Sequence, residues 1–300
     1  MASTISTVNE ALVDDKVVEA LRYVMPMLNS FSLGITAEGK IQSDVVYVPI
    51  ATDPTVASKT AGTIVSATGT VAGTSVTLSN FYGAGWDVNE GKMSSRLLPS
   101  YWADKAAGAV YVLAKQVVDA ALALITASNY SDTDDDKLSV APGDFGLSDV
   151  ALLWEKAETK IKQRQRSLGL NAAYAAAVMG ESNVALVYSN TGNNFVQSGI
   201  VPQMIGMNTW AYGAFPSNSE NLGGAVFGKA AILVGVAPPD QILSSGEGDI
   251  IERRLITEPD SGITAMYTST ATAGGNLAGE VALLYGVAKG QNAVVRLVTA

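Results

Sequence analysis

Two glycine-rich motifs have spacings that could bind a phosphate. Residues Gly223–Lys229, GGAVFGK, match the G-x-x-x-x-G-K pattern of a phosphate-binding loop. Ala230 stands where such a loop needs Ser or Thr for magnesium, and an apolar strand is predicted where a helix should begin. The motif GAGWDV, which begins at Gly83, lacks the third glycine and the helix of a dinucleotide loop. The sequence therefore predicts no nucleotide-binding site.

A run of aspartates resembles the start of a calcium loop. Asp132, Asp134 and Asp136 occupy its first three ligand positions. Lys137 stands where Gly must make the turn, and Gly143 stands where a bidentate Glu should complete the coordination. We therefore expect a solvated acidic loop, with weak divalent binding left as the alternative.

The chain contains neither cysteine nor histidine. Their absence excludes disulfides, thiolate or imidazole metal ligands and every histidine-based general base. Catalysis would have to use carboxylates, Lys, Tyr or Ser, and no pair of carboxylates stands out, although any two can meet in a fold. We predict no catalytic residue, no cofactor and no metal, and we keep a carboxylate-dependent hydrolase as an alternative function.

The composition is apolar and poor in charge, with 48% hydrophobic and 16% charged residues. Charged residues make up about a quarter of an ordinary soluble domain. The deficit suggests that other copies of the chain cover much of its surface. The net charge of −9 argues against general nucleic-acid binding. The one basic cluster, Lys160, Lys162, Arg164 and Arg166, ends a predicted helix, whose negative dipole end it complements.

The N-terminal segment has neither the basic start nor the apolar core of a secretory signal. No stretch of about 18 apolar residues free of charge is present to span a membrane. We therefore predict that the chain is made and used in the cytoplasm and has no membrane partner.

A long helix is predicted over residues 100–128, and the other elements are arranged around it. Apolar or small residues recur there at steps of three or four, which is the helical period. Ser100 is the predicted N-cap, because it follows Pro99. A helix of this length spans roughly 40 Å. It could serve as a spine between two lobes or as an ordinary core helix.

The segments before this helix differ in character. A short amphipathic helix is predicted over Asn9–Met25 and should end at Pro26. Residues 41–87 are rich in Thr and Val and contain two β-rich runs around a small polar tip. We interpret them as a long protruding two-stranded loop, with two strands of an internal sheet as the alternative.

The segments after the spine helix mix helix and strand signals. Ser148 is predicted to cap a second helix that Gly169 ends, with Trp154 on its buried face. A strong strand is predicted over Ala230–Val236. The last 55 residues or so return to strand character by alternation, although residues 279–290 could form a strand or a short helix.

Three stretches carry a resemblance to a known family. They are RSLGLNAAYAAAVMGESNVA at 166–185, MNTWAYGAFPSNSENLGGAVFGKAAILVGVAPP at 207–239 and GEVALLYGVAKGQNAVVRLVTA at 279–300. Together with the order of the elements, they resemble the major capsid protein of tailed bacteriophages, whose fold encapsulin shells share. The resemblance covers nearly the whole chain and consists of patterns of residue type and order.

The resemblance implies an α+β capsid fold in five parts. These parts are an N-terminal arm (1–40), an extended β loop (41–87), a peripheral domain with the spine helix (88–137), an axial α/β domain (138–245) and a peripheral β layer (246–300). It also implies self-assembly as hexamers and pentamers into an icosahedral capsid around double-stranded DNA. Separate scaffolding and portal proteins would be partners, the host cytoplasm the place of assembly and the virion capsid the final location.

Five residues are predicted to contact neighbouring subunits: Lys59, Thr60, Trp102, Trp210 and Tyr212. In one branch of the family a loop lysine bonds covalently to a neighbour's Asn, and Lys59 sits at the predicted loop tip, but no partner Asn can be identified. The main alternative function is an encapsulin-like compartment shell. A surface adhesin is a weaker alternative, because a secretory signal is missing.

Overall fold

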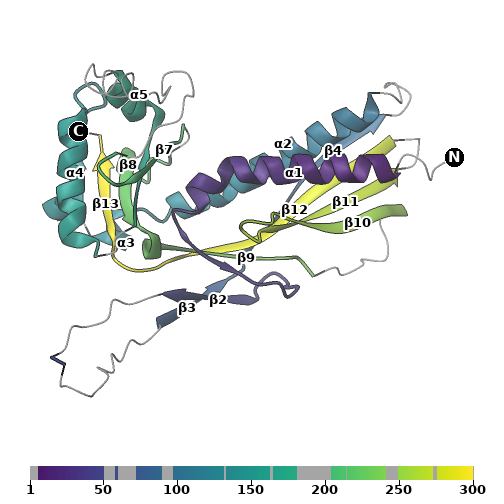
Figure 1. Ribbon diagram of the computed structural model, residues 1–300, viewed down its shortest axis with the longest axis horizontal. Coiled ribbons are helices and arrows are strands. Elements are labelled where there is room, and N and C mark those ends of the chain that lie inside the picture. Colours follow the sequence, from purple (N-terminus) through teal and green to yellow (C-terminus); the bar gives the residue numbers. More distant parts are fainter. Residues whose placement is uncertain are drawn as a thin grey trace.

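A computed structural model describes residues 6–50, 58–59, 72–89, 97–131, 133–162, 165–180, 204–213, 215–240, 249–272 and 276–299. The molecule is elongated and has two lobes (Figure 1). A lobe built around a five-stranded sheet lies at one end, and a long six-stranded sheet with two helices along it forms the rest. Helices and strands form separate layers, which confirms the predicted α+β class.

The predicted spine is helix α2, Leu98–Leu122. Its start differs from the prediction, because Leu97 is the N-cap and Pro99 lies in the first turn, where a missing N–H costs no intrahelical bond. The Ser100 hydroxyl instead donates to the Leu97 carbonyl at 3.1 Å. In the described part of the chain no helix is both long and apolar enough to cross a membrane.

Helix α2 also ends earlier than predicted. The Asn218 side chain donates to the carbonyl oxygens of Leu122 at 3.0 Å and Ile125 at 2.6 Å. These bonds come from a distant segment and satisfy carbonyls that the helix end leaves without partners. A separate short helix, α3 (Ala127–Tyr130), follows after Thr126, whose hydroxyl accepts a bond from Asn129 N.

Helix α1 runs from Ser6 to Leu28 and packs along α2 of the same chain. Pro26 is predicted to end it but lies inside the last turn, and the Asn29 N–H still bonds to the Met25 carbonyl at 2.8 Å. A proline this close to the end removes little of the hydrogen-bond ladder. One face of α1 is buried, at Val13, Val17, Leu21, Val24 and Leu28.

The six-stranded sheet is organised by its longest strand, β12 (Asn276–Lys289). This strand pairs with β11 and β9 along one side and with β4 along the other. β10 joins β11, and β1 joins β9. The bounds are Ser32–Ile35 for β1, Asn80–Asn89 for β4, Ile232–Ala237 for β9, Asp249–Thr257 for β10 and Thr264–Thr272 for β11.

Two predictions change with this sheet. Residues 279–289 are strand, which settles the choice between strand and short helix left open by the sequence. Residues 80–87, predicted as part of the protruding loop, belong to β4 and pair along the whole length of β4 with β12. Pairing with a strand about 200 residues away is invisible to local alternation.

The five-stranded sheet has the strand order β5-β13-β8-β6-β7. Helices α4 (Leu147–Lys160) and α5 (Ala172–Gly180) belong to the same lobe. The strands are β5 (Lys137–Ser139), β6 (Arg166–Leu170), β7 (Asn208–Ala211), β8 (Leu222–Gly228) and β13 (Val294–Val298).

Several expectations for this lobe are corrected. Residues 294–298, assigned to the peripheral layer, form β13 and pair with β8 here. The predicted strand Ala230–Val236 is observed as β9, which begins at Ile232 after a 3₁₀ turn at Lys229–Ala231, but it lies in the long sheet and not in this lobe. Helix α4 begins after Gly146, not at Ser148 as predicted, and it ends at Lys160. Gly169, which is predicted to end this helix, lies in β6.

The prediction that Trp154 lies on the buried face of its helix is also wrong. Trp154 is 36% exposed, whereas Val150, Leu153 and Ala157 of α4 are buried as predicted. Gly169 has a packing role, because a Cβ there would lie 2.7 Å from the ring of Trp210.

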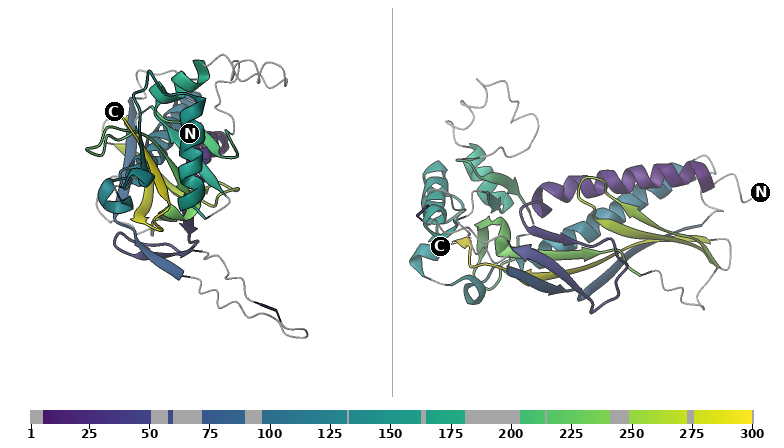
Figure 2. Two further views of the ribbon diagram at one scale, coloured as in Figure 1. Left: turned by 90° about the vertical axis from the view of Figure 1, so that its left-hand side faces the viewer. Right: turned by 60° about the horizontal axis from the view of Figure 1, so that its bottom comes forward.

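The start of the predicted β loop forms a separate layer. β2 (Val45–Ile50) and β3 (Ala72–Thr77) make a two-stranded sheet of their own, whereas β4, at the end of the same segment, is a strand of the long internal sheet, so the segment contains parts of both alternatives. Figure 2 shows these strands on the opposite side of the long sheet from α1 and α2. Their inner side chains are buried against the sheet, in clusters that contain Val46, Val48, Ile50, Val76, Leu78, Leu233, Ala237 and Leu284.

A row of three glycines lets this layer approach the sheet closely. Gly34, Gly235 and Gly286 lie side by side on β1, β9 and β12, because Gly34 pairs with Gly235 and Gly235 with Gly286. A Cβ on Gly286 would lie 2.0 Å from the Thr77 carbonyl oxygen, and one on Gly34 would lie 2.5 Å from a Val48 methyl. Backbone can therefore pack on backbone here.

The glycine row predicts a position-specific loss of stability. Gly286→Ala should lower the free energy of unfolding by about 1–3 kcal/mol, because the new methyl group overlaps Thr77. Gly108→Ala is the control, since a Cβ there meets nothing within 4 Å and alanine favours a helix by up to about 1 kcal/mol. Urea unfolding of the two variants measures both effects. Equal stability of the variants would contradict the close approach.

Candidate assembly surfaces

The β2 strand exposes an apolar row on its outer side. Val45 and Tyr47 alternate with the buried Val46 and Val48, and Tyr47 is 63% exposed. Successive strand side chains point to opposite faces, so this row faces away from the sheet. Apolar side chains arranged in a row on an extended layer suit contact with another protein surface.

A groove of about 390 Å³ lies on the same sheet face, beside the start of the hairpin. Apolar walls come from Phe81, Met266 and Leu284. Charged side chains of both signs also line it, namely Lys40, Asp240, Arg253 and Glu280. A surface that mixes apolar area with both charges is typical of a protein contact and does not favour a polyanion.

A second exposed area lies on the helices. Tyr23 of α1 is 70% exposed and makes an edge-to-face contact with Tyr111 of α2, with 5.6 Å between ring centroids. A shallow hollow beside this pair is lined by residues that include Lys16, Glu19 and Gly108. Aromatic side chains of this kind are enriched where proteins contact one another.

Three of the predicted contact residues lie inside the subunit. Trp102 packs edge-to-face against Trp86 and donates its indole N–H to the Tyr267 hydroxyl at 2.7 Å. Trp210 donates its indole N–H to the Ser30 hydroxyl at 3.0 Å. Trp102, Trp210 and Tyr212 are each 6% exposed, which leaves little surface for a neighbouring subunit. Their contact with a neighbour stays a prediction.

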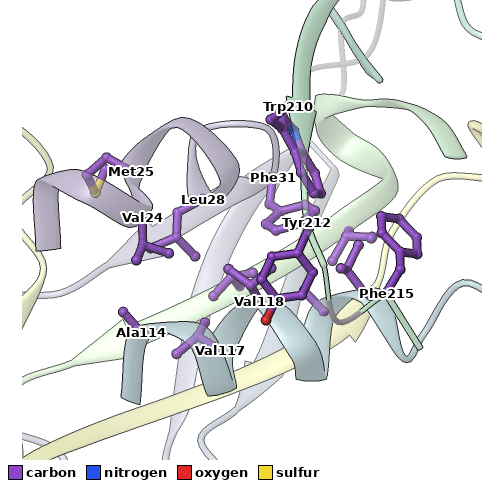
Figure 3. Packing of buried hydrophobic residues seen from close by; sticks show 14 of the residues in the cluster. Val24, Met25, Leu28, Phe31, Ala114, Val117, Val118, Trp210, Tyr212 and Phe215 are labelled. Atoms are coloured by element: carbon purple, nitrogen blue, oxygen red, sulfur yellow. The ribbon is translucent and has the colours of Figure 1, made fainter. Parts of the chain in front are cut away.

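Tyr212 joins the two lobes. Its hydroxyl bonds to the Asp119 carboxylate of α2 at 2.5 Å, and Lys115 lies 5.6 Å from its ring centroid. Figure 3 shows Tyr212 directed toward α2, near Val118. Burial, and then the bond to Asp119, raise the pKa of the Tyr212 hydroxyl well above its usual range.

The other two predicted contacts fall on the loop. Lys59 is described and exposed. Thr60 lies outside the described residues. The prediction that they touch a neighbouring subunit is untested for both.

The acidic loop is held by an ion pair. Asp136 accepts bonds from Lys160 of α4 and from the Thr133 hydroxyl, and both charged groups of the pair are largely buried. Asp134 is exposed, and Asp132 lies outside the described residues. Among the described residues, no group of three or more acidic side chains could hold a metal ion. Asp136 thus serves the fold of this lobe.

The glycine motif Gly223–Lys229 is mostly strand. β8 is buried along its length, and a Cβ on Gly224 would lie 2.6 Å from the Gly169 carbonyl oxygen. The motif therefore packs against a neighbouring strand at the positions where a phosphate loop would need open backbone.

Sequence reasoning missed an ion pair that fixes α1 to the long sheet. The Glu258 side chain is fully buried and accepts bonds from Ser261 N at 2.6 Å and from Arg22 Nε at 3.2 Å. Burial opposes its ionisation, but the bonds from Ser261 and Arg22 outweigh burial and lower the pKa of Glu258. The turn sequence EPDSG marks a tight turn, but no local signal relates it to Arg22, 236 residues away.

The Asp136 pair predicts an acid-dependent stability term. Burial opposes ionisation of Asp136, but the bonds from Lys160, Thr133 and Ser131 outweigh it and hold the pKa well below its usual 3.8. A carboxyl with a lowered folded pKa stabilises the fold above the unfolded pKa and loses that contribution as the pH falls toward the folded value. Asp136→Asn should therefore cost about 3 kcal/mol at neutral pH. The difference from the native chain should shrink below pH 3.8.

Urea unfolding at a series of pH values measures this effect. The exposed Asp135→Asn is the matched control and should leave the free energy of unfolding nearly unchanged. A cost for Asp136→Asn that does not vary with pH would contradict the role of the ionised carboxylate.

No protein-family model matches this chain, and no curated protein matches it. Several solved structures, in contrast, match this chain. The virus-like particle from Pyrococcus furiosus aligns at 12% identity with a TM-score of 0.51, over 96% of this chain and 98% of that chain. The mature capsid of bacteriophage PhiM1 aligns at 11% identity with a TM-score of 0.50, over 91% and 86% of the two chains.

A structure from Microbacterium phage Oxtober96 aligns at 11% identity with a TM-score of 0.51, over 91% of this chain and 90% of that chain. At these identities the likeness concerns the fold, which extends over nearly the whole of each chain. The chain therefore has the tailed-phage capsid fold that its motifs predict.

Proposed function

We propose that this chain is the structural subunit of an icosahedral phage capsid, assembled as hexamers and pentamers around a double-stranded DNA genome. The observation that carries the proposal is the end-to-end likeness to a chain of the PhiM1 mature capsid, over 91% and 86% of the two chains. The proposed role is purely structural, and the subunit performs no catalysis.

Surface composition supports this proposal. Only 16% of the residues are charged, and large apolar side chains such as Tyr23, Tyr47 and Val112 are exposed. An interface of about 1,000 Å² is enough for a specific contact, and its apolar part contributes roughly 25 cal/mol per Å². Each subunit makes several such contacts, and closure of the shell couples them.

In the proposed shell the five-stranded lobe surrounds each capsomer axis. The long sheet with α1 and α2 makes the contacts between capsomers, and the β loop reaches across a neighbouring subunit. A separate scaffolding protein directs assembly in the host cytoplasm, and a portal protein admits the genome. The net charge of −9 fits an enclosed genome without sequence-specific contacts, because a strongly basic lining would hold the DNA in place instead of letting it pack.

An encapsulin-like compartment shell is the second candidate. The likeness to the virus-like particle from Pyrococcus furiosus, over 96% and 98% of the two chains, favours it as a role for the same fold. The two candidates differ in what the shell encloses. Neighbouring portal and terminase genes would favour the phage capsid, and a gene for a cargo enzyme would favour the compartment.

The proposal predicts that the purified chain, alone or with its scaffolding protein, assembles into closed shells. Negative-stain microscopy, with light scattering of the same sample, measures this. Nuclease-resistant DNA inside native particles would support the capsid. A strictly monomeric chain under all conditions would contradict both shell functions.

Shortening the tip of the β loop should separate assembly from folding. Deletion of residues 57–61 should leave the unfolding transition of the subunit unchanged, because the buried residues of β2 and β3 lie outside the deletion. The yield of closed shells should fall. Circular dichroism and microscopy of the same preparation measure both, and an unfolded variant would contradict the assignment of this segment as protruding.

A further inference from the structure

The long sheet has one edge that lacks the usual protection against strand pairing. The edge strand β10 carries Glu252, Arg253 and Arg254, and Arg254 bonds to Asp14 of α1 at 3.1 Å. The edge strand β1 has four residues. β4 has ten residues, NFYGAGWDVN, with neither lysine nor proline and with a single charge, Asp87. Charged side chains, prolines and short length are the devices that keep edge strands from pairing with other chains.

The outer side of β4 is accessible. In the described part of the chain β4 pairs with β12 alone, so one side of its backbone has no strand beside it. Two of its three aromatic side chains are also exposed, 45% for Phe81 and 46% for Tyr82, and Trp86 is partly buried against the core. A long, apolar and exposed edge of this kind is a site for strand addition.

Helix α2 extends the apolar surface past this edge. A hollow of about 610 Å³ lies between β4 and the exposed side of α2. Gly108 leaves it open, because a Cβ there would meet nothing within 4 Å, and Val112 beside it is 58% exposed. The hollow contains one acid, Asp104, and one base, Lys105, so it presents no net charge to a molecule that faces it.

The sequence of β4 is self-complementary about Ala84. If two copies run antiparallel with Ala84 opposite Ala84, Tyr82 faces Trp86 on the helix side, and Gly83 faces Gly85 on the other side. Aromatic pairs directly across neighbouring strands stabilise a sheet. A register centred on Gly83 would instead set Tyr82 against Ala84.

We propose that β4 pairs edge to edge with β4 of a second copy of this chain, antiparallel and centred on Ala84, which joins the two long sheets into one. The contact is isologous, so each copy contributes the same residues. The inference rests on the proposed function as a shell subunit and names one of the contacts between subunits.

Charge favours this register. Asp87 faces Phe81 of the second copy, and the two Asp87 side chains lie six residues apart along the strands, roughly 20 Å. Repulsion across that distance is screened at physiological salt. Arg254 of β10 is already bonded to Asp14 of α1, which argues for β4 as the edge that is used.

Engineered cysteines can test the contact, because the chain has none of its own. Residues directly opposite in an antiparallel pair lie at Cα distances that a disulfide can bridge. Ala84→Cys is a small change and should give a disulfide-linked dimer on non-reducing gels after mild oxidation. Leu255→Cys, which is 39% exposed on β10, is the matched control and should stay monomeric.

A mixed pair tests the register. Phe81→Cys and Asp87→Cys should form a dimer when the two variants are mixed before assembly, and neither should do so alone, because identical positions lie roughly 20 Å apart. Dimers from each variant alone, or none from the mixture, would overturn the register centred on Ala84.

The assembled and the soluble fractions are both analysed, with microscopy of each. Dimers of Ala84→Cys in either fraction support the β4 contact. Shells without such dimers would overturn the β4 contact and leave the proposed function intact. Dimers without shells under any condition would support the contact and count against the shell function. Dimers of Leu255→Cys but not of Ala84→Cys would assign the contact to β10 and overturn the proposal.

Discussion

The structure depends on one strand, β12, that is packed on both faces. Helices α1 and α2 cover one face, and the β2–β3 layer lies across part of the other. Two glycines make this possible. A Cβ on Gly279 would lie 2.5 Å from the ring of Trp86 and 2.7 Å from the ring of Trp102, and Gly286 accepts the backbone of Thr77 on the opposite face. Because these glycines have no side chain, the helices on one face of β12 and the β2–β3 layer on the other can pack closely enough to exclude water.

The two lobes are joined where two of the chain's crossings between them lie side by side. The crossing from β8 to β9 lies beside the crossing from β12 to β13. Gly290 N bonds to the Ala231 carbonyl at 2.8 Å, and Gln291 N bonds to the Ala230 carbonyl at 2.9 Å. The Tyr130 hydroxyl also donates to the Ala231 carbonyl, at 2.6 Å. These bonds hold the two crossings together at the junction of the lobes.

Burial within the subunit is nevertheless incomplete. The β2–β3 layer covers one part of the sheet face, and a neighbouring part contributes to the groove that Phe81 and Leu284 line. The outer row of β2 and the exposed side of α2 have no cover among the described residues. An elongated chain with few charges therefore retains apolar area that contact between copies can remove from water.

The sequence by itself determined the elements whose signals are local. The helical period identified α2, and the order of helix and strand signals with three motif stretches identified the capsid fold. The sequence could not determine which sheet a strand joins. Residues 80–87, 232–237 and 294–298 carry ordinary strand signals, and distant partners decided their sheets.

The same reason explains why the sequence did not predict the burial of Trp102, Trp210 and Tyr212. They are predicted as contact residues, but tertiary packing decided that they lie inside the subunit, because burial depends on neighbours far away in the chain.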